Sequence, residues 1–261
     1  MVSRMPARDA RIDNAYDNAM VTIADTSRAS FSGRRLRGAV AHMLGRAILA
    51  GDYAPGDALP PEVSHAESLG VSRGAYREAV QALIAKGLVE SRPKSGTRVL
   101  SRDRWNMLDP DVLGWAFSGA PDLQLLRSLF ELRTMVEPCG AALAAERRTR
   151  DDLRRMKDAL GRMRRETLSS EAGRTADRDF HDAILKASRN DALITLSASI
   201  AAAVDWTTQL KQRERVLPRD PIPDHVAVYD AIVSGDGDGA RNAMNKLVEL
   251  ALIDTRAALG E

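Results

Sequence analysis

Apolar side chains recur every three or four positions along residues 34–50, which predicts an amphipathic helix. Gly51 follows directly and is a common helix stop. A short second helix is predicted over residues 61–69, after a segment rich in Gly and Pro that makes the chain turn. A third is predicted over residues 73–86, with Ser72 before it as an N-cap whose hydroxyl can accept a hydrogen bond from a free amide of the first turn.

After the third helix the pattern changes from helical spacing to alternation. Residues 88–100, LVESRPKSGTRVL, alternate apolar and polar on both sides of RPKSG, which predicts a two-stranded β-hairpin with a basic tip. Three helices and a hairpin follow the order of a winged helix-turn-helix, although other small α+β domains share that order. We assign a winged helix-turn-helix to residues 33–100. Residues 1–32 show no apolar stripe wide enough to pack, so we predict a mobile N-terminal arm there.

From residue 121 onward strand signals vanish and Ala, Leu, Arg and Glu dominate. Short breaks such as SRND, PRDPIP and GDGDG divide this part into helices. The helices are predicted over residues 122–147, 150–168, 172–187, 190–213, 222–234 and 236–258. We therefore predict a mainly α protein, in which an antiparallel six- to seven-helix bundle (121–261) follows the winged helix. Residues 101–120 form a linker, and Trp105, Trp115 and Phe117 suit it to dock between the two domains.

Composition supports two folded domains and excludes several classes of protein. The chain has 261 residues, of which 44% are hydrophobic and 28% charged, a globular composition and not a disordered one. No apolar run reaches the roughly 18 residues of a membrane helix, and the N-terminus lacks the apolar core of a signal peptide. We expect a cytoplasmic protein that has no membrane partner. The single Cys139 cannot form an internal disulfide.

Basic residues are concentrated in the first third of the chain. Between residues 34 and 100, ten Lys and Arg occur with six Asp and Glu. Many solvated surfaces carry such a surplus, so it does not by itself indicate nucleic-acid binding. Arg73 and Arg77 lie four positions apart on the predicted third helix and project from one face, where their guanidinium groups can bond to guanine or to phosphate. The alternative is that the two arginines only solvate the helix.

The segment ILAGDYAPGDALPPE...LGVSRGAYREAVQALIAKGLVESRPKSGTRV resembles the DNA-binding domain of GntR-type bacterial transcription regulators. The resemblance implies that the helix starting at VSR enters the major groove of double-stranded DNA and that the hairpin wing reaches the minor groove or the backbone. It implies DNA contacts on this helix and at the wing tip by Ser72, Arg73, Gly74, Arg77, Lys94, Ser95 and Gly96. Many relatives have an arginine where this chain has Val63, which puts one DNA contact of the family in doubt.

Three segments of the helical part, LFELRTMVEPCGAALAAERRT, DRDFHDAILKASRND and DHVAVYDAI, resemble the FCD ligand-binding and dimerisation domain of the FadR subfamily of these regulators. RWNMLDPDVLGW and VEPCGAALAAERRT further resemble galactonate-responsive repressors, which regulate sugar-acid catabolism. The resemblance implies a homodimer that binds a palindromic operator. It predicts a repressor of sugar-acid or hydroxy-acid genes that a small carboxylate effector, such as a sugar acid, releases from its operator.

Asp177 and His181 lie four positions apart on one predicted helix, so a carboxylate and an imidazole point the same way and can hold one cation. From spacing alone, a surface hydrogen bond is the simpler explanation. The resemblance implies that Asp177, His181 and His225 occupy the positions of the family's metal ligands, so we expect a divalent metal, zinc or manganese. Leu247 stands where metal-binding relatives usually have one more histidine. Either the remaining ligands leave open positions for a chelating effector, or the site holds no metal and both histidines bond the effector directly.

Arg133, in the first helix of the predicted bundle, matches the family arginine that pairs with an effector carboxylate. A salt bridge with Glu131 or Glu137 is the alternative. A metal-dependent all-helical enzyme with a fused winged helix is the alternative function for the whole chain. The sequence pairs no nucleophile with a base and shows no obvious second carboxylate beside Asp177, so we expect a regulator and not an enzyme.

Overall fold

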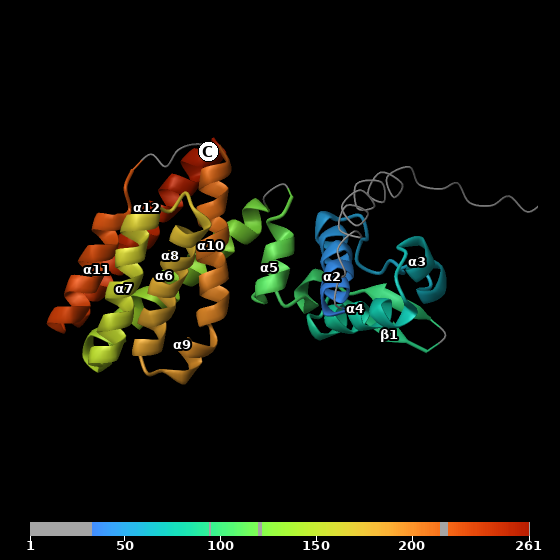
Figure 1. The fold of residues 1–261 in the computed structure, drawn as a ribbon, viewed down its shortest axis with the longest axis horizontal. Coiled ribbons are helices and arrows are strands. Elements are labelled where there is room, and N and C mark those ends of the chain that lie inside the picture. Colours follow the sequence, from blue (N-terminus) through green and yellow to red (C-terminus); the bar gives the residue numbers. More distant parts are fainter. Residues whose placement is uncertain (1–32, 94, 120–121, 215–218, 261) are drawn as a thin grey trace, which may run out of the picture. The chain divides into compact units, whose positions relative to one another are not determined.

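A computed structural model describes residues 33–93, 95–119, 122–214 and 219–260 of the chain, except for the side chains of 33–37 and 212–214. The chain divides into two compact units, Met1–Ala120 and Pro121–Glu261 (Figure 1). The predicted N-terminal arm of residues 1–32 lies outside the described residues.

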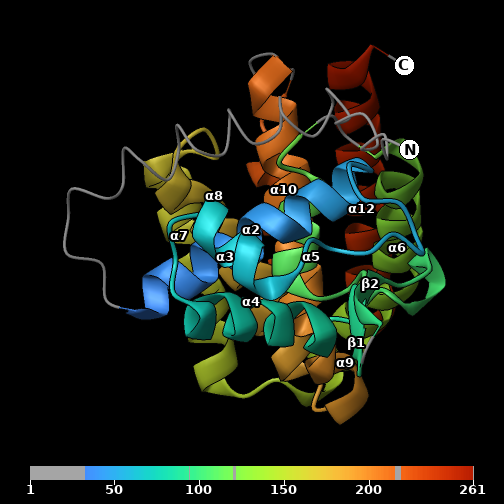
Figure 2. The same ribbon diagram turned by 90° about the vertical axis from the view of Figure 1, so that its right-hand side faces the viewer.

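The N-terminal unit consists of short helices and a two-stranded wing. Helix α2 (Gly33–Ala50) and helix α3 (Glu62–Ser68) both pack against helix α4 (Arg73–Ala85). Strands β1 (Val89–Arg92) and β2 (Gly96–Val99) pair antiparallel, so that the first residue of β1 lies opposite the last of β2 (Figure 2). The predicted winged helix-turn-helix is confirmed.

Burial of one face explains why these helices form where they do. Val40, Leu44 and Ile48 of α2 are spaced by four and are almost inaccessible to solvent. They share a hydrophobic core with Ala79 and Leu83 of α4. Each fully buried Leu or Ile is worth about 1.5–3 kcal/mol relative to an exposed one, which fixes the face of each helix that turns inward.

Residues 101–119, the described part of the predicted linker 101–120, pack onto the N-terminal unit. Their elements are a 3-10 turn, η1 (Arg102–Arg104), and helix α5 (Pro110–Ala116). Trp105 and Trp115 are both part of the core that α2 and α4 form. The ring of Trp115 lies so close to Gly45 of α2 that a Cβ there would come within 2.2 Å of the indole. This close approach requires glycine at position 45.

The C-terminal unit is a helical bundle, with seven helices among the residues that the structure describes. They are α6 (Leu123–Arg147), α7 (Arg150–Glu166), α8 (Glu171–Ala187), α9 (Asp191–Thr195), α10 (Ser197–Glu214), α11 (Ile222–Ser234) and α12 (Gly237–Leu259). Helix α8 packs against α6, α7 and α10, while α12 packs against α6, α10 and α11. The predicted mainly α fold with a C-terminal helical domain is confirmed.

One predicted helix is two helices in the structure. Residues 190–213 were expected to form a single element, but a turn at Leu196 separates α9 from α10. Leu193 and Leu196 both pack against a buried cluster that includes Val136 of α6 and Leu185 of α8. The contacts of these leucines with the cluster accompany the break.

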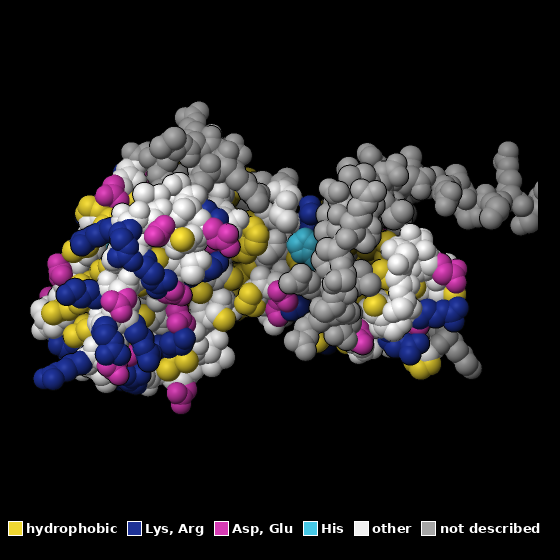
Figure 3. All heavy atoms as spheres, in the orientation of Figure 1, with side chains coloured by type: hydrophobic (Ala, Val, Ile, Leu, Met, Phe, Trp, Pro, Cys, Tyr) yellow, Lys and Arg dark blue, Asp and Glu magenta, His cyan; other side chains and the backbone are white. Residues whose placement is uncertain are grey.

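One face of the bundle carries mixed charges. On the face seen in Figure 3, basic and acidic side chains of the C-terminal unit are intermixed, with apolar side chains scattered among them. This distribution is typical of helices that turn one stripe inward and keep the opposite face in water. No helix within the described ranges is long enough and apolar enough to cross a membrane.

Candidate functional site

Helix α4 begins at a side-chain cap. Ser72 Oγ accepts a hydrogen bond from the amide of Ala75 at 3.1 Å, so the predicted N-cap is confirmed. Arg73, Gly74 and Arg77 follow on the exposed side of the helix. A Cβ on Gly74 would meet only Ser72 Oγ, at 3.9 Å, so the surface beside this glycine is open to a ligand.

Both arginines of this face are paired with glutamates of α3. Arg77 Nη2 lies 2.7 Å from Glu62 Oε1, and Arg77 Nε lies 3.3 Å from Glu62 Oε2. Arg73 Nη2 lies 3.9 Å from Glu67 Oε1. The side chains of Arg73 and Arg77 are 62% and 66% exposed. Exposed ion pairs contribute about 0–1 kcal/mol, so each arginine can exchange its glutamate for another anion at little cost.

The tip of the wing is described in part, because Lys94 lies outside the described residues. Ser95 is exposed, and its amide donates to the carbonyl of Arg92 at 3.2 Å. Gly96 has a φ of 73°, in the left-handed region that favours glycine. Gly96 therefore has a structural reason to be glycine, independent of any ligand.

A histidine is buried between α3 and α4. His65 is 2% exposed, and its Nδ1 lies 2.9 Å from the hydroxyl of Tyr76. Burial lowers the pKa of His65 to about 4. The side chain is therefore uncharged at neutral pH and serves the packing of the N-terminal unit.

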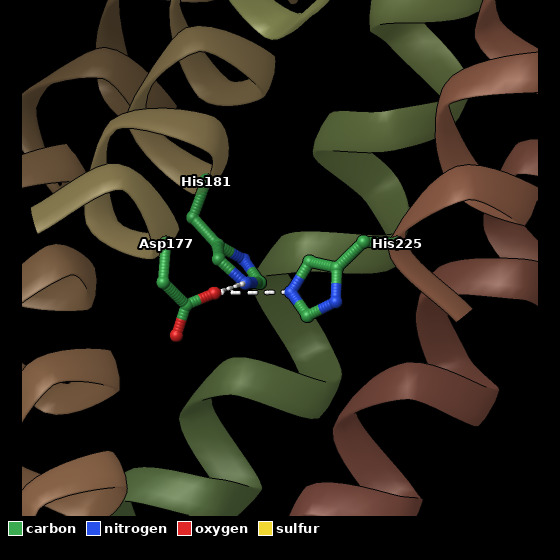
Figure 4. A group of neighbouring side chains, drawn as sticks. All are labelled: Asp177, His181 and His225. Carbon is green, nitrogen blue, oxygen red and sulfur yellow. Dashed lines mark hydrogen bonds and ion pairs between the residues drawn. The ribbon is translucent and has the colours of Figure 1, made fainter. Parts of the chain in front are cut away.

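In the C-terminal unit, Asp177, His181 and His225 converge (Figure 4). Asp177 and His181 belong to α8, His225 belongs to α11, and all three are buried. Asp177 Oδ1 lies 3.0 Å from His225 Nε2 and 3.6 Å from His181 Nε2. The structure thus brings together the three residues that the sequence marks as candidate metal ligands, with one carboxylate oxygen facing a nitrogen of each imidazole.

The other nitrogen of each imidazole meets an acceptor. His181 Nδ1 makes a short hydrogen bond with Oε2 of Glu137 on α6, and His225 Nδ1 lies 2.8 Å from the carbonyl oxygen of Pro221. A carbonyl oxygen only accepts, so His225 Nδ1 carries a proton. Histidines that bind metals usually donate this way from one nitrogen, which leaves the lone pair of the other for the ion.

Glu137 also connects His181 to Arg133. Its Oε1 lies 2.6 Å from Arg133 Nε, one turn earlier on α6, and both side chains are buried. Burial acts to raise the pKa of Glu137, but the charges and hydrogen bonds of Arg133 and His181 outweigh it and lower the pKa to about 2. The sequence left Glu131 and Glu137 as possible salt-bridge partners of Arg133. In the structure, Arg133 pairs with Glu137.

Asp177 remains ionised although it is buried. Burial acts to raise its pKa, but the hydrogen bond and charge of His225, together with the charges of His181 and Lys211, hold the pKa well below its ordinary value. Thr208 Oγ1 donates to Asp177 Oδ2 at 3.4 Å. A buried carboxylate that keeps its charge is suited to bind a cation.

A small cavity adjoins these three side chains. Its volume is about 20 Å³, which is room for about one water molecule. Leu247 of α12 lines it and offers no ligand atom. Arg133, Lys211 and Arg219 line it as well, so three cationic side chains surround the cavity. Burial lowers the pKa of Lys211 to about 8, although the charge of Asp177 acts in the opposite direction.

The donor atoms fit a divalent transition metal. One ligand atom each from Asp177, His181 and His225 lies within 4.8 Å of the others, and no other such group of His, Cys, Asp or Glu occurs within the described part of the chain. Two imidazole nitrogens and a carboxylate oxygen suit zinc, and manganese also accepts this set. Glu137 and the carbonyl oxygen of Pro221, which contact the Nδ1 atoms of His181 and His225, also fit a metal site.

Sequence reasoning named Glu137 only as a possible partner of Arg133, and it did not identify Lys211. Glu137 contacts His181 and supplies the second carboxylate that the sequence did not reveal. Its spacing of four from Arg133 on one helix was the available signal. Lys211 carried no signal, because only the packing of α10 against α8 brings it toward Asp177.

Models of known families match both units. A model described as "Bacterial regulatory proteins, gntR family" matches residues 36–99, which extend from α2 to the end of β2. A model described as "FCD domain" matches residues 128–250, which include Asp177, His181 and His225.

Curated relatives cover most of the chain. The galactonate operon transcriptional repressor of Escherichia coli K12 is 37% identical over 77% of this chain and 88% of its own length. A protein of the same organism named "Putative L-lactate dehydrogenase operon regulatory protein" is 33% identical over 85% of this chain and 86% of its own length. A solved structure of Lar, titled as controlling the agr system of Listeria monocytogenes, is 18% identical with a TM-score of 0.61 and covers 85% of this chain and 96% of its own. This last likeness shows the fold alone.

Proposed function

The chain belongs to the GntR family of bacterial regulatory proteins and carries an FCD domain, and from this premise we propose that it represses genes for the catabolism of a sugar acid or hydroxy acid. It is a transcriptional regulator and not an enzyme. The names of its galactonate-operon and lactate-operon relatives support the class of genes. The observation that carries the proposal is the buried group of Asp177, His181 and His225, which could hold a metal ion and lies in the same chain as a winged helix-turn-helix.

The proposed DNA contacts come from the start of α4 and from the wing. The residues are Ser72, Arg73, Gly74, Arg77, Lys94, Ser95 and Gly96. Arg73 and Arg77 exchange their glutamates for guanine edges or phosphates in the major groove. Ser72 Oγ already accepts from Ala75, so its hydroxyl proton is available to a phosphate. Lys94 adds a phosphate contact that does not depend on base sequence.

The proposed assembly is a homodimer on a palindromic operator in the bacterial cytoplasm. A two-fold protein dimer matches the symmetry of two inverted half-sites. The FCD domain supplies the dimer contact. A small carboxylate effector favours a dimer geometry in which the two recognition helices no longer fit their half-sites, and so releases the operator.

The proposed effector site includes a divalent metal, zinc or manganese, held by Asp177, His181 and His225. An ion held there would supply a Lewis-acidic centre for the carboxylate and adjacent hydroxyl of a 2-hydroxy acid. Because Leu247 provides no ligand, positions remain open for that acid. Arg133 lines the same cavity and is proposed to pair with the carboxylate.

Release of DNA by candidate acids tests this function. The DNA is a palindrome selected by the protein from random sequences, and release is measured with galactonate and L-lactate before and after chelator treatment. We expect one acid to release DNA, chelation to abolish the release and added zinc to restore it. Asp177→Asn should lose the response, whereas Asp182→Asn, on the same helix but paired with Lys186, should keep it.

Two outcomes would count against parts of the proposal. Equal release before and after chelation would exclude the metal and favour direct bonding of the acid by His181 and His225. Absence of specific DNA binding would contradict the regulatory function itself.

A further inference from the structure

Three cationic side chains line the cavity, but their surroundings differ. Arg133 lies 2.6 Å from a carboxylate oxygen of Glu137, and Arg219 lies 3.1 Å from one of Asp254. Lys211 of α10 has no carboxylate within 4.0 Å and no hydrogen-bond acceptor among the residues that the structure describes. It is therefore the cation of this cavity that forms no ion pair within the described residues, although the charges of Asp177 and Asp254 act on it from a greater distance.

The burial of Lys211 makes the absence of an ion pair significant. The residue is only 7% exposed. Its removal from water disfavours the ammonium more than the charges of Asp177 and Asp254 favour it, whereas Met or Leu would fill a similar volume without that cost. Packing therefore does not explain a lysine here, and a charge kept at a loss of stability inside a pocket points to ligand binding.

Helix α10 directs Lys211 toward the candidate metal ligands. One turn earlier on α10, Thr207 contacts Arg133 Nη1 and Thr208 contacts Asp177 Oδ2, each at 3.4 Å. Residues three and four positions apart share a helix face, so Lys211 continues the face that meets these groups. Lys211 and Asp177 line the same cavity.

The charges around the cavity indicate the charge of the ligand that Lys211 would bind. Arg133 and Glu137 form a neutral pair. Asp177 balances Lys211 as long as no metal is bound, but a divalent ion on Asp177 leaves this part of the site with an excess of positive charge. A carboxylate reduces that excess, whereas a neutral sugar or alditol does not.

We propose that Lys211 binds the carboxylate of the effector and selects acids over neutral sugars. The inference rests on the proposed function and adds to it a residue that supplies the charge for binding. Arg133 Nε holds Glu137, and through it His181, while no described residue accepts from Arg133 Nη2. Arg133 Nη2 and Lys211 Nζ can therefore share the two oxygens of one carboxylate.

Titration of four anions into the wild-type protein and into Lys211→Met tests the proposal. The probes are galactonate, L-lactate, malonate and inorganic phosphate, with galactitol as a neutral comparison, each measured by calorimetry with zinc present. We expect the anions that bind the wild type to bind Lys211→Met about 10- to 100-fold more weakly, the range for a charge-assisted hydrogen bond. Galactitol should bind neither protein.

Lys246→Met is the matched control. Lys246 lies on α12, is 68% exposed and is 3.4 Å from Asp224, so this variant removes the same charge from the outside of the bundle. Its anion affinities should stay within about twofold of the wild type, since an exposed charge at a distance is screened.

Two further measurements distinguish a role of Lys211 in anion binding from a purely structural role. Zinc alone should bind Lys211→Met more tightly than the wild type, because a like charge near the ion has been removed. With zinc bound, the melting temperature of the variant should equal or exceed that of the wild type, because a charge that repels the ion has been removed. A lower melting temperature together with weaker zinc binding would show that Lys211 is structural and overturn the proposal.

The anion titration tests the role of Lys211 independently of the DNA assay. Equal anion affinity of wild type and Lys211→Met, or no anion binding by the wild type, would overturn the role of Lys211 even if the protein binds its operator. Loss of anion binding in the variant would support that role even if no acid releases DNA, in which case the proposed regulation fails and the anion site stands.

Discussion

Glu137 accepts a hydrogen bond from Nδ1 of His181, and both side chains are buried although they come from different helices. Because the carboxylate engages Nδ1, the opposite nitrogen of the ring, Nε2, faces Asp177. Arg133 holds the second oxygen of the same carboxylate. The orientation of His181 is thus set by α6 before any ion binds, which reduces the ordering that metal binding requires.

Glu137→Gln should weaken zinc binding by about 10- to 100-fold, since partners that orient metal ligands typically matter to this degree. The glutamine keeps the size of the side chain but leaves Arg133 without its counter-ion, so the variant should also unfold more easily. Zinc competition assays and thermal unfolding measure the two effects. Glu131→Gln, an exposed position on the same helix, should change neither quantity. Unchanged zinc affinity in Glu137→Gln would show that the orientation of His181 does not matter.

Leu247→His should restore a fourth protein ligand. The side chain of Leu247 is buried and lines the cavity beside the three candidate ligands, so an imidazole there can reach the same ion. We expect tighter zinc binding and, because fewer positions remain open, weaker binding of 2-hydroxy acids. Leu247→Met, which adds no nitrogen, is the control. If Leu247→His bound both zinc and acid as the wild type does, the idea that acids occupy an open metal position would be wrong.

Arg77→Ala should weaken binding to the selected operator by about 1–3 kcal/mol per half-site if the guanidinium contacts a base. Arg46→Ala, which removes the same charge from an exposed position on α2, should have a much smaller effect. Glu62→Gln should strengthen DNA binding, because it frees Arg77 and removes a negative charge next to the DNA-binding face. Gel-shift titrations at two salt concentrations measure all three variants. Full operator affinity in Arg77→Ala would exclude Arg77 from recognition.

The N-terminal unit should lose stability as the pH falls from about 6.5 to about 4. The pKa of His65 is lowered from 6.5 to about 4 by burial, so the unfolded chain binds a proton in this interval while the folded chain does not. Stability from the neutral histidine is complete above pH 6.5 and decreases below it. His65→Phe keeps a ring that cannot titrate and should show a smaller loss between pH 7 and pH 5. Hydrogen exchange of the α3 and α4 amides measures this, and parallel losses in both proteins would refute it.

Much of the fold was predictable because its helices each bury one stripe of side chains. The apolar repeat of Val40, Leu44 and Ile48 marks both the extent and the inward face of α2. The turn at Leu196 was not predictable, since both segments beside it have helical periodicity and the break accompanies contacts with helices far away in sequence.

The candidate site was predictable only as far as its own spacing and the family resemblance extend. Asp177 and His181 share a helix, and the resemblance added His225. The ion pair of Arg77 with Glu62 and the place of Lys211 beside Asp177 depend on how separate helices pack, which no local pattern encodes. Glu137 was noted as a partner of Arg133, but its contact with His181 crosses from α6 to α8.

The cavity next to Asp177 has consequences for the speed of the response. It has room for about one water molecule, so the side chains that line it must move before a 2-hydroxy acid can occupy it. The observed rate of association should then rise with effector concentration and level off at the rate of that opening. Escape of the bound acid must wait for the same event. At high concentrations of the proposed effector, its exchange would therefore proceed at the pace of that opening and not at the pace of diffusion.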